Sequence, residues 1–208
     1  DEQNLFQALV NSAKTNNFNH IIATDITGYN LSYRALLSSA VKYANSLKEQ
    51  LSDKEKIGIC MPSGFNFLIT FWAIQYLGKT AVILSENNIE KQIAMSKPDV
   101  LISVKTFDNV KTPVINLKEV KPKKIALKQH IKANKTCVIM FKDNLKLEYG
   151  CKEILRSYHE LDCILPFNVK DVAVNTLDSD NSDAFVLGFI LPVLSGIKTC
   201  FMPNINAK

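Results

Sequence analysis

The residues best suited to chemistry lie in the stretch CVIMFKDNLKLEYGC, residues 137–151. Its first five residues are apolar and indicate a buried strand, and such a strand can deliver a phosphate to a glycine-rich loop. Here the strand is followed by Lys142, Asp143, Lys146 and Glu148, and the only glycine is the last residue but one. Lysines favour a phosphate, whereas carboxylates and missing glycines oppose it. The stretch therefore raises the question of whether this chain binds a nucleotide.

Other groups that could hold a metal or act in catalysis are sparse. The acidic stretch DSDNSD, residues 178–183, resembles the start of a calcium loop, but it lacks the sixth-position glycine, and Phe189 stands where the twelfth-position Glu would be. The histidines His20, His130 and His159 are too far apart in sequence to indicate a ligand set. Paired catalytic carboxylates, a serine nucleophile elbow and a GxGxxG fingerprint do not occur. We therefore assign no catalytic, cofactor-binding or metal-ligating residue.

The cysteines and the lengths of the apolar runs indicate in which cellular compartment to expect the chain. The five cysteines form no CxxC pair and indicate small core residues in a reducing compartment; they are Cys60, Cys137, Cys151, Cys163 and Cys200. No uninterrupted apolar run reaches the roughly 18 residues of a membrane span, and the N-terminus DEQNLFQ lacks a signal pattern. We expect a cytoplasmic location and no transmembrane segment.

The net charge is concentrated in one segment. The chain has 208 residues, is 47% apolar and carries a formal charge of +5, so it can bury one core or two closely packed lobes. Much of the positive charge lies in residues 118–135, whose lysines are Lys118, Lys121, Lys123, Lys124, Lys128, Lys132 and Lys135. Such a run is usually a solvated loop, and the alternatives are contact with an acidic carrier protein, a membrane surface or nucleic acid. We expect no nucleic-acid partner and leave the oligomeric state open.

Helical and strand patterns alternate along the chain. The expected helices cover residues 5–14, 33–51, 64–77, 88–95, 151–165 and 184–194. The expected strands cover residues 20–25, 56–61, 80–85, 100–104, 114–117, 137–141, 172–176 and 198–202. Because continuous apolar strands alternate with helices, we expect an α/β fold with mostly parallel sheets covered by helices on both faces.

The lysine-rich run also suggests a division of the chain. We expect a first α/β lobe in residues 1–117, a linker in residues 118–135, and a second βαβαβ segment in residues 136–208 that packs with the first lobe.

Several segments, taken in order, resemble a known family. They are LFQALVNSA, LSYRALLSSAVKYANSLKEQ, EKIGICMPSGFNFLITFWAIQYLGKTAVILS and AFVLGFILPVLSGIKTCFMPN. They resemble the adenylate-forming, AMP-binding superfamily, which includes acyl-CoA synthetases, acyl-carrier-protein synthetases and luciferases. The nearest comparison is the synthetase half of the bifunctional acyl-carrier-protein synthetase and 2-acylglycerophosphoethanolamine acyltransferase. These motifs belong to the scaffold of the family's fold rather than to its catalytic site.

The resemblance implies the N-terminal subdomains of an enzyme that activates fatty acids. In that family ATP and a carboxylate give an acyl-adenylate and pyrophosphate, with Mg²⁺ neutralising phosphate charge, and a thiol then takes the acyl group. A loop of form T-S-G-T-T-G-x-P-K-G, placed after the strand that corresponds to residues 137–141, supplies amides, hydroxyls and a lysine.

This sequence departs from the family at that loop. Lys142, Asp143 and Asn144 stand where the family has Thr, Ser and the first Gly, and Gly150 alone remains as a shifted equivalent. We interpret the phosphate loop as lost and expect no ATP or Mg²⁺ site in this chain.

A second motif is missing as well. Residues 177–185, LDSDNSDAF, replace the family segment P-L-F-H-x-x-G, and no histidine follows His159. The sequence ends at Lys208, ahead of the adenine, Mg²⁺ and ribose motifs and of the C-terminal domain with the catalytic lysine.

Two functional hypotheses remain. The chain is either the degenerate or truncated N-terminal part of an acyl-activating enzyme, silent without a longer assembly, or a non-catalytic domain that binds a carrier protein, an acyl ligand or a synthetase partner. A reading frame that continues past Lys208 would favour the first hypothesis, and a stop codon there would favour the second.

Overall fold

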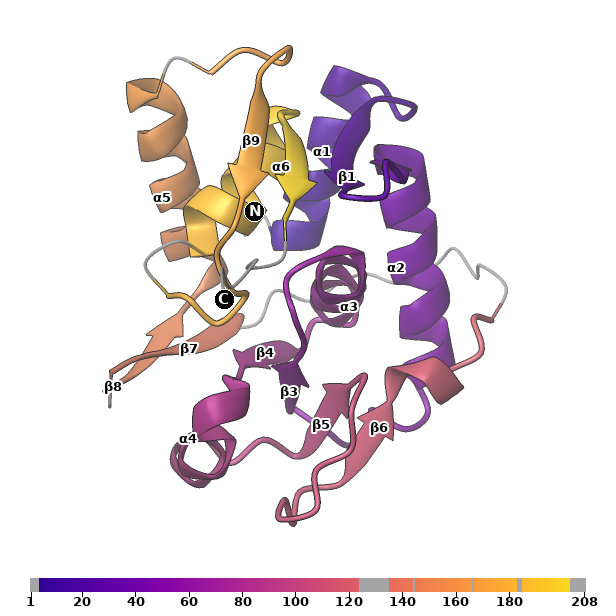
Figure 1. Cartoon of the computed structure of the whole chain (residues 1–208), viewed down its shortest axis with the longest axis vertical. Helices are drawn as coiled ribbons and strands as arrows, with labels where there is room; N and C mark the ends of the chain where they lie inside the picture. Colours follow the sequence, from indigo (N-terminus) through magenta and orange to yellow (C-terminus); the bar gives the residue numbers. More distant parts are fainter. Residues whose placement is uncertain (1–3, 124–134, 144, 166, 183–184, 203–208) are drawn as a thin grey trace.

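The computed structural model describes residues 4–123, 135–143, 145–165, 167–182 and 185–202, which form helices and two sheets (Figure 1). The α-helices are α1 (Leu5–Asn16), α2 (Tyr33–Leu47), α3 (Phe65–Tyr76), α4 (Ile89–Ser96), α5 (Cys151–Ile164) and α6 (Leu191–Ser195). Shorter turns of helix are η1 (Glu86–Asn88), η2 (Leu117–Glu119) and η3 (Val186–Ile190). The strands are β1 (Ile21–Asp25), β2 (Asn30–Ser32), β3 (Lys56–Cys60), β4 (Thr80–Ile83), β5 (Val100–Ser103), β6 (Val114–Asn116), β7 (Val138–Lys142), β8 (Leu145–Tyr149), β9 (Val172–Asn175) and β10 (Lys198–Phe201).

The strands form a larger and a smaller sheet. The larger sheet has the order β6-β5-β3-β4-β7-β8 and the smaller one β2-β1-β10-β9. Their strands pair in parallel, except that β2 and β8 are antiparallel strands at the edges. This arrangement confirms the predicted α/β class with mostly parallel sheets.

The two sheets do not divide at the lysine-rich segment. Strands β7 and β8 extend the sheet built by β3 to β6, and β9 and β10 join β1 near the N-terminus. The first part of the lysine-rich segment lies against α2, where Ser46 Oγ donates to the Lys121 carbonyl at 2.8 Å and accepts from the Lys123 amide at 2.8 Å. Residues 124–134 lie outside the described residues, and the division into lobes and linker stays a prediction.

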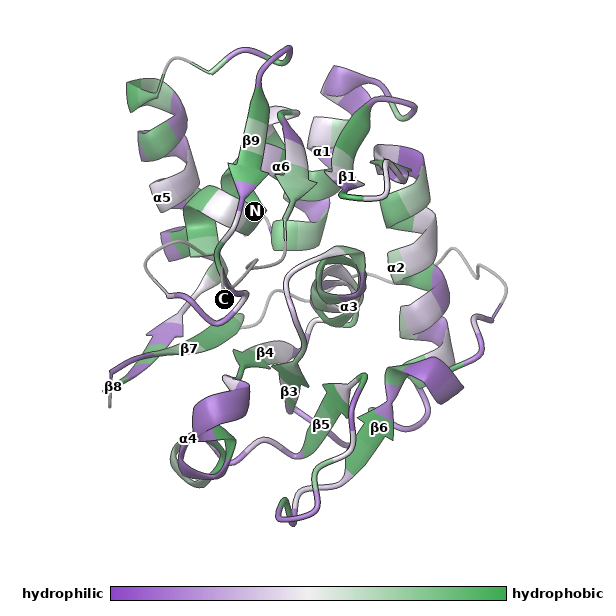
Figure 2. Ribbon diagram, in the orientation of Figure 1, coloured by the Kyte–Doolittle hydropathy of each residue, from purple (hydrophilic) through white to green (hydrophobic). Residues whose placement is uncertain are grey.

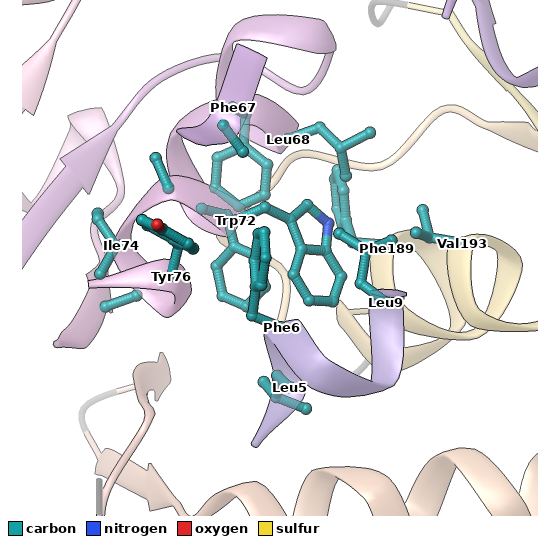
Figure 3. Close-up of a cluster of buried hydrophobic side chains, with 14 of the residues drawn as sticks. Leu5, Phe6, Leu9, Phe67, Leu68, Trp72, Ile74, Tyr76, Phe189 and Val193 are labelled. Atoms are coloured by element: carbon teal, nitrogen blue, oxygen red, sulfur yellow. The ribbon is translucent and has the colours of Figure 1, made fainter. Parts of the chain in front are cut away.

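Helix α3 lies at the centre of the core because it is apolar on almost every side. It covers one face of the larger sheet, and α4 covers the other. In Figure 3 Trp72 of α3 lies among Phe6 and Leu9 of α1 and Phe189 of η3. Figure 2 shows the central strands of the larger sheet as hydrophobic along their length, as parallel strands covered on both faces should be.

The helix boundaries follow the expected caps. Ser32 precedes α2, and its hydroxyl accepts a hydrogen bond from the Ala35 amide at 3.2 Å, as predicted from sequence. Gly64 precedes α3 with φ 147°, a conformation that disfavours any residue with a side chain.

Within the described ranges no helix has the length and apolar character needed to span a membrane.

Three features differ from the predicted elements. Strands β2 and β8 were not expected, because β2 has three residues and the residues of β8 were assigned to a loop. The helix expected over residues 184–194 begins with a π-helix, η3, and only its last part is α-helical.

The π-helix accompanies a missing backbone donor. Pro192 has no N–H with which to reach the Gly188 carbonyl four residues earlier. The side-chain amide of Asn175, on β9, donates to that carbonyl at 3.1 Å. A Cβ at position 188 would lie 2.9 Å from Asn175 Nδ2, so glycine is needed for this close approach. Asn175 is therefore buried as a substitute donor that joins β9 to η3.

We predict that Asn175→Ala lowers the free energy of unfolding by about 1–3 kcal/mol, because the Gly188 carbonyl loses its donor. Chemical denaturation measures this change, and Asn30→Ala, at an exposed strand position, is the matched control. In a Pro192→Ala background the backbone N–H returns, so the cost of Asn175→Ala should shrink. Equal costs in both backgrounds would contradict this explanation.

A second stability prediction concerns Tyr33, whose ring is fully buried. Its hydroxyl donates to the Val193 carbonyl of α6, and burial raises the pKa of Tyr33 well above its ordinary value. Tyr33→Phe should cost about 1–3 kcal/mol, because the buried carbonyl loses a donor. Tyr29→Phe, at a ring that is 66% exposed, should change stability by less than about 0.5 kcal/mol. Equal effects of the two substitutions in a thermal unfolding experiment would refute the assignment.

Candidate functional site

The stretch expected to replace the phosphate loop is a tight β-hairpin. Strands β7 and β8 pair from Val138 opposite Tyr149 to Lys142 opposite Leu145. Only residues 143 and 144 connect the strands, and Asp143 has the positive φ of 53° that suits a short hairpin turn. Most of residues 142–149 therefore pair within the sheet instead of forming the family loop with which they align. A ten-residue phosphate loop has no room between these strands.

The one glycine of this stretch does not provide a phosphate donor either. Gly150 immediately precedes α5, and its amide donates to the carboxylate of Glu153 in the first turn of the helix. A Cβ at position 150 would lie 2.8 Å from the Lys135 carbonyl, so close packing requires glycine here. The positive end of the α5 dipole is thus capped by a carboxylate of the helix itself.

The lysines of the hairpin do not create a positive pocket. Lys146 Nζ lies 2.7 Å from Glu148 Oε1 on the same strand. This pair lowers the pKa of the Glu148 carboxyl, which therefore stays charged near neutral pH. Lys142 is exposed at the end of β7. Residues 142–148 carry two lysines and two carboxylates, which gives little net attraction for a polyanion.

The remaining groups considered from the sequence lie apart from one another. His20 Nε2 lies 2.7 Å from the Gly196 carbonyl, so this nitrogen carries the proton and donates. His159 lies on α5, and His130 falls outside the described residues. Among the residues that the structure describes, no cluster of His, Cys, Asp and Glu could hold a metal ion.

The cysteines are all free thiols. Cys60, Cys137 and Cys151 are buried as expected, whereas Cys163 is exposed on α5 and does not serve as a core residue. Cys60 borders a cleft at the end of β3.

The acidic stretch at residues 178–183 fastens the loop after β9 to the end of β3. Ser179 is buried, and its hydroxyl donates to the Met61 carbonyl at 2.7 Å. In return Ser63 Oγ donates to the Leu177 carbonyl at 2.6 Å. The described part of the acidic stretch is thus a polar turn that connects the two sheets, and residue 183 lies outside the described residues.

A cleft of about 170 Å³ opens at the carboxyl ends of β3, β4 and β5. Its charged and polar lining comes from segments far apart in sequence: Cys60, Ser85, Glu86, Lys105, Asp178 and Asp180. The Ser103 hydroxyl donates to the Cys60 carbonyl at 2.9 Å and holds β5 to β3 at the base of the cleft. Lys105 Nζ lies 2.8 Å from both carboxylate oxygens of Glu86.

The cleft has a negative potential at its floor. Burial raises the pKa of the Cys60 thiol to about 12, and the charges of Glu86 and Asp180 add to this effect while Lys105 opposes it. The thiol is therefore protonated near neutral pH and is a poor nucleophile. The arrangement suits binding more than covalent catalysis.

Sequence reasoning missed this cleft, although it left a signal. Polar residues follow two buried parallel strands after one apolar residue, at Ser85–Glu86 after β4 and at Lys105 after β5. The carboxyl ends of parallel strands lie together at one edge of a sheet, where ligands of open α/β sheets bind.

Comparison with known structures supports the fold assignment. The fused adenylation and carrier-protein protein NpsA-ThdA from Klebsiella oxytoca superposes with a TM-score of 0.82 at 13% identity, over 97% of this chain and 38% of that one. The NpsA N-terminal subdomain from Klebsiella oxytoca, in complex with 3-hydroxyanthranilyl-AMSN, has a TM-score of 0.81 at 13% identity, over 97% of this chain and 54% of that one. VinN in complex with L-aspartate has a TM-score of 0.83 at 14% identity, over 95% of this chain and 62% of that one.

These structures are longer than this chain, which spans between 38% and 62% of their lengths. No curated protein matches the sequence. The sequence pattern of the AMP-binding enzyme family matches residues 10–149, from α1 to the end of β8. Because this match covers more than half of the sequence, the chain belongs to the AMP-binding enzyme family.

Proposed function

We propose that this chain is a diverged N-terminal region of a carboxylate-activating protein and does not form acyl-adenylates by itself. Fatty-acid activation for transfer to a thiol is the ancestral chemistry that we infer from the resemblance to acyl-carrier-protein synthetases. The observation that carries the proposal is the two-residue connection between β7 and β8. This short connection lies where a nucleotide-binding site would need a longer loop with free backbone amides.

The electrostatics of the same region support the proposal. A phosphate near the β7–β8 turn would meet the carboxylate of Asp143 there. Two like charges about 4 Å apart cost roughly 4 kcal/mol at an effective dielectric of about 20. The Gly150 amide cannot offset this repulsion, because it lies at the other end of β8 and already donates to Glu153.

The neighbouring structures widen the range of carboxylates and suggest a partner. VinN was solved in complex with L-aspartate, and a four-domain nonribosomal peptide synthetase was solved with AMP and glycine, so an amino acid is an alternative to a fatty acid. NpsA-ThdA is an artificially fused adenylation and carrier-protein di-domain. We propose an acyl carrier protein, or the remainder of a longer synthetase, as the partner of this chain. We also propose a cytoplasmic location, which the exposed free thiol of Cys163 supports.

A second function is favoured by the cleft at the end of β3. Its polar lining and its volume of about 170 Å³ fit a small polar ligand better than an acyl chain. On this alternative the chain is a non-catalytic binding or regulatory domain, whose ligand acts on a carrier protein or a synthetase partner.

We predict that the purified chain shows no micromolar binding of ATP with Mg²⁺ in isothermal titration calorimetry. It should also release no pyrophosphate when a fatty acid or an amino acid is added. The physical reason is the short connection between β7 and β8, which leaves no room for a loop of amide donors. A carboxylate-activating enzyme of the same family, measured in parallel, confirms that the assay works.

Micromolar ATP binding together with pyrophosphate release would overturn the proposal. Circular dichroism and a cooperative thermal transition establish that the chain is folded when it fails to bind. The variant Glu153→Gln removes the carboxylate from the start of α5 without changing the hairpin. It should not restore ATP binding, because the short turn remains.

A further inference from the structure

The cleft at the end of β3 lies where the larger sheet changes direction. The chain passes from β3 through α3 to β4 on one side of β3, and then through α4 to β5 on the other side. Helices α3 and α4 consequently cover opposite faces, and the segments after β3, β4 and β5 separate. Open α/β sheets bind ligands in the crevice that this reversal creates.

The walls of the cleft carry more negative than positive charge. Glu86, Asp178 and Asp180 contribute three carboxylates, and Lys105 contributes one ammonium group. Lys105 is paired with Glu86. In the described part of the chain, the carboxylates of Asp178 and Asp180 take part in no ion pair. The cleft therefore has unbalanced negative charge on the side of the β9 loop.

The thiol of a buried core residue borders the same space. Cys60 is 5% exposed, and none of the hydrogen bonds of the described residues uses its thiol. Thiols donate and accept weak hydrogen bonds, so this group is available to a bound molecule. Ser179 and Ser103, in contrast, use their hydroxyls to hold the walls in place. Hydrogen bonds within the protein thus fix the walls of the cleft. The Cys60 thiol at its floor is left for a hydrogen bond to a bound molecule.

The volume and the charge of the cleft limit the class of ligand that can bind there. A volume of about 170 Å³ is about six times the volume share of a water molecule in the liquid, so the ligand is small. Anions are disfavoured by the carboxylates, and an acyl chain would strip water from charged walls without replacing its hydrogen bonds. A metal ion is disfavoured because no suitable ligand cluster occurs among the described residues.

We propose that this cleft binds a small organic cation, with a primary ammonium group on the side of Asp180 and a short carbon chain above Cys60. The walls come from two sheets, so the ligand also joins the β9 loop to the end of β3. This inference specifies the ligand of the alternative function and rests on that function. It does not depend on whether ATP binds.

The test uses 1,4-diaminobutane as the probe, with the neutral 1,4-butanediol as its isosteric control. Calorimetry at low ionic strength should detect binding of the diamine and none of the diol, because attraction to exposed charges is screened by salt. Asp180→Asn should weaken binding of the diamine by about tenfold, since one charge near the ammonium group is lost. Asp53→Asn, an equal charge change at the opposite end of β3, should leave affinity unchanged.

A variant with the opposite effect separates binding from misfolding. Lys105→Met removes the one ammonium group of the walls and should tighten diamine binding several-fold. Bound diamine should also slow alkylation of Cys60, followed by peptide mass spectrometry, relative to the exposed Cys163. Equal binding of diamine and diol, or an unchanged affinity in Asp180→Asn, would overturn the proposal. ATP is not present in this experiment, so its failure leaves the loss of adenylation as a separate result.

Discussion

The burial of α3 is the interaction on which both sheets depend. One side of this helix covers the larger sheet, and its aromatic residues reach the elements of the smaller sheet. The ring centroids of Phe67 and Phe189 are 4.9 Å apart, and those of Phe71 and Phe185 are 5.4 Å apart. Each buried aromatic side chain contributes about 1.5–3 kcal/mol through removal from water. Because these contacts join residues far apart in sequence, the ends of β3 and β9 are held close together, and the cleft between them follows from the core.

The proposed loss of adenylation fits the physical chemistry of the β7–β8 hairpin. The paired strands, the glycine at the start of α5 and the strand order all remain, because each contributes to folding. A phosphate loop contributes binding instead, and its glycines weaken the folded state through their conformational entropy. A short turn with Asp143 closes the same strands without that cost. The Glu153 cap then stabilises the helix where an anion would otherwise sit.

The sequence predicted the parts of the fold that depend on local patterns. Continuous apolar runs identified β3, β4 and β5, and Ser32 marked the start of α2. The residues of β8, LKLEY, alternate between apolar and charged side chains, which is a strand signal, but the resemblance to a family loop led us to assign them otherwise. The π-helix could not be predicted, because it involves Asn175 and Gly188, which are brought together only by the fold. The cleft was missed for the same reason, since four separate segments form it.

The short hairpin also has a consequence for protein engineering. Its strands are fixed in register by the sheet, and the turn at residue 143 lies at the free end of both strands. Insertions at the tips of exposed hairpins are tolerated because they extend away from the core. A glycine-rich segment grafted between β7 and β8 would therefore leave the strands paired. Such a graft turns the chain into a host in which the minimal requirements for nucleotide capture can be rebuilt one component at a time.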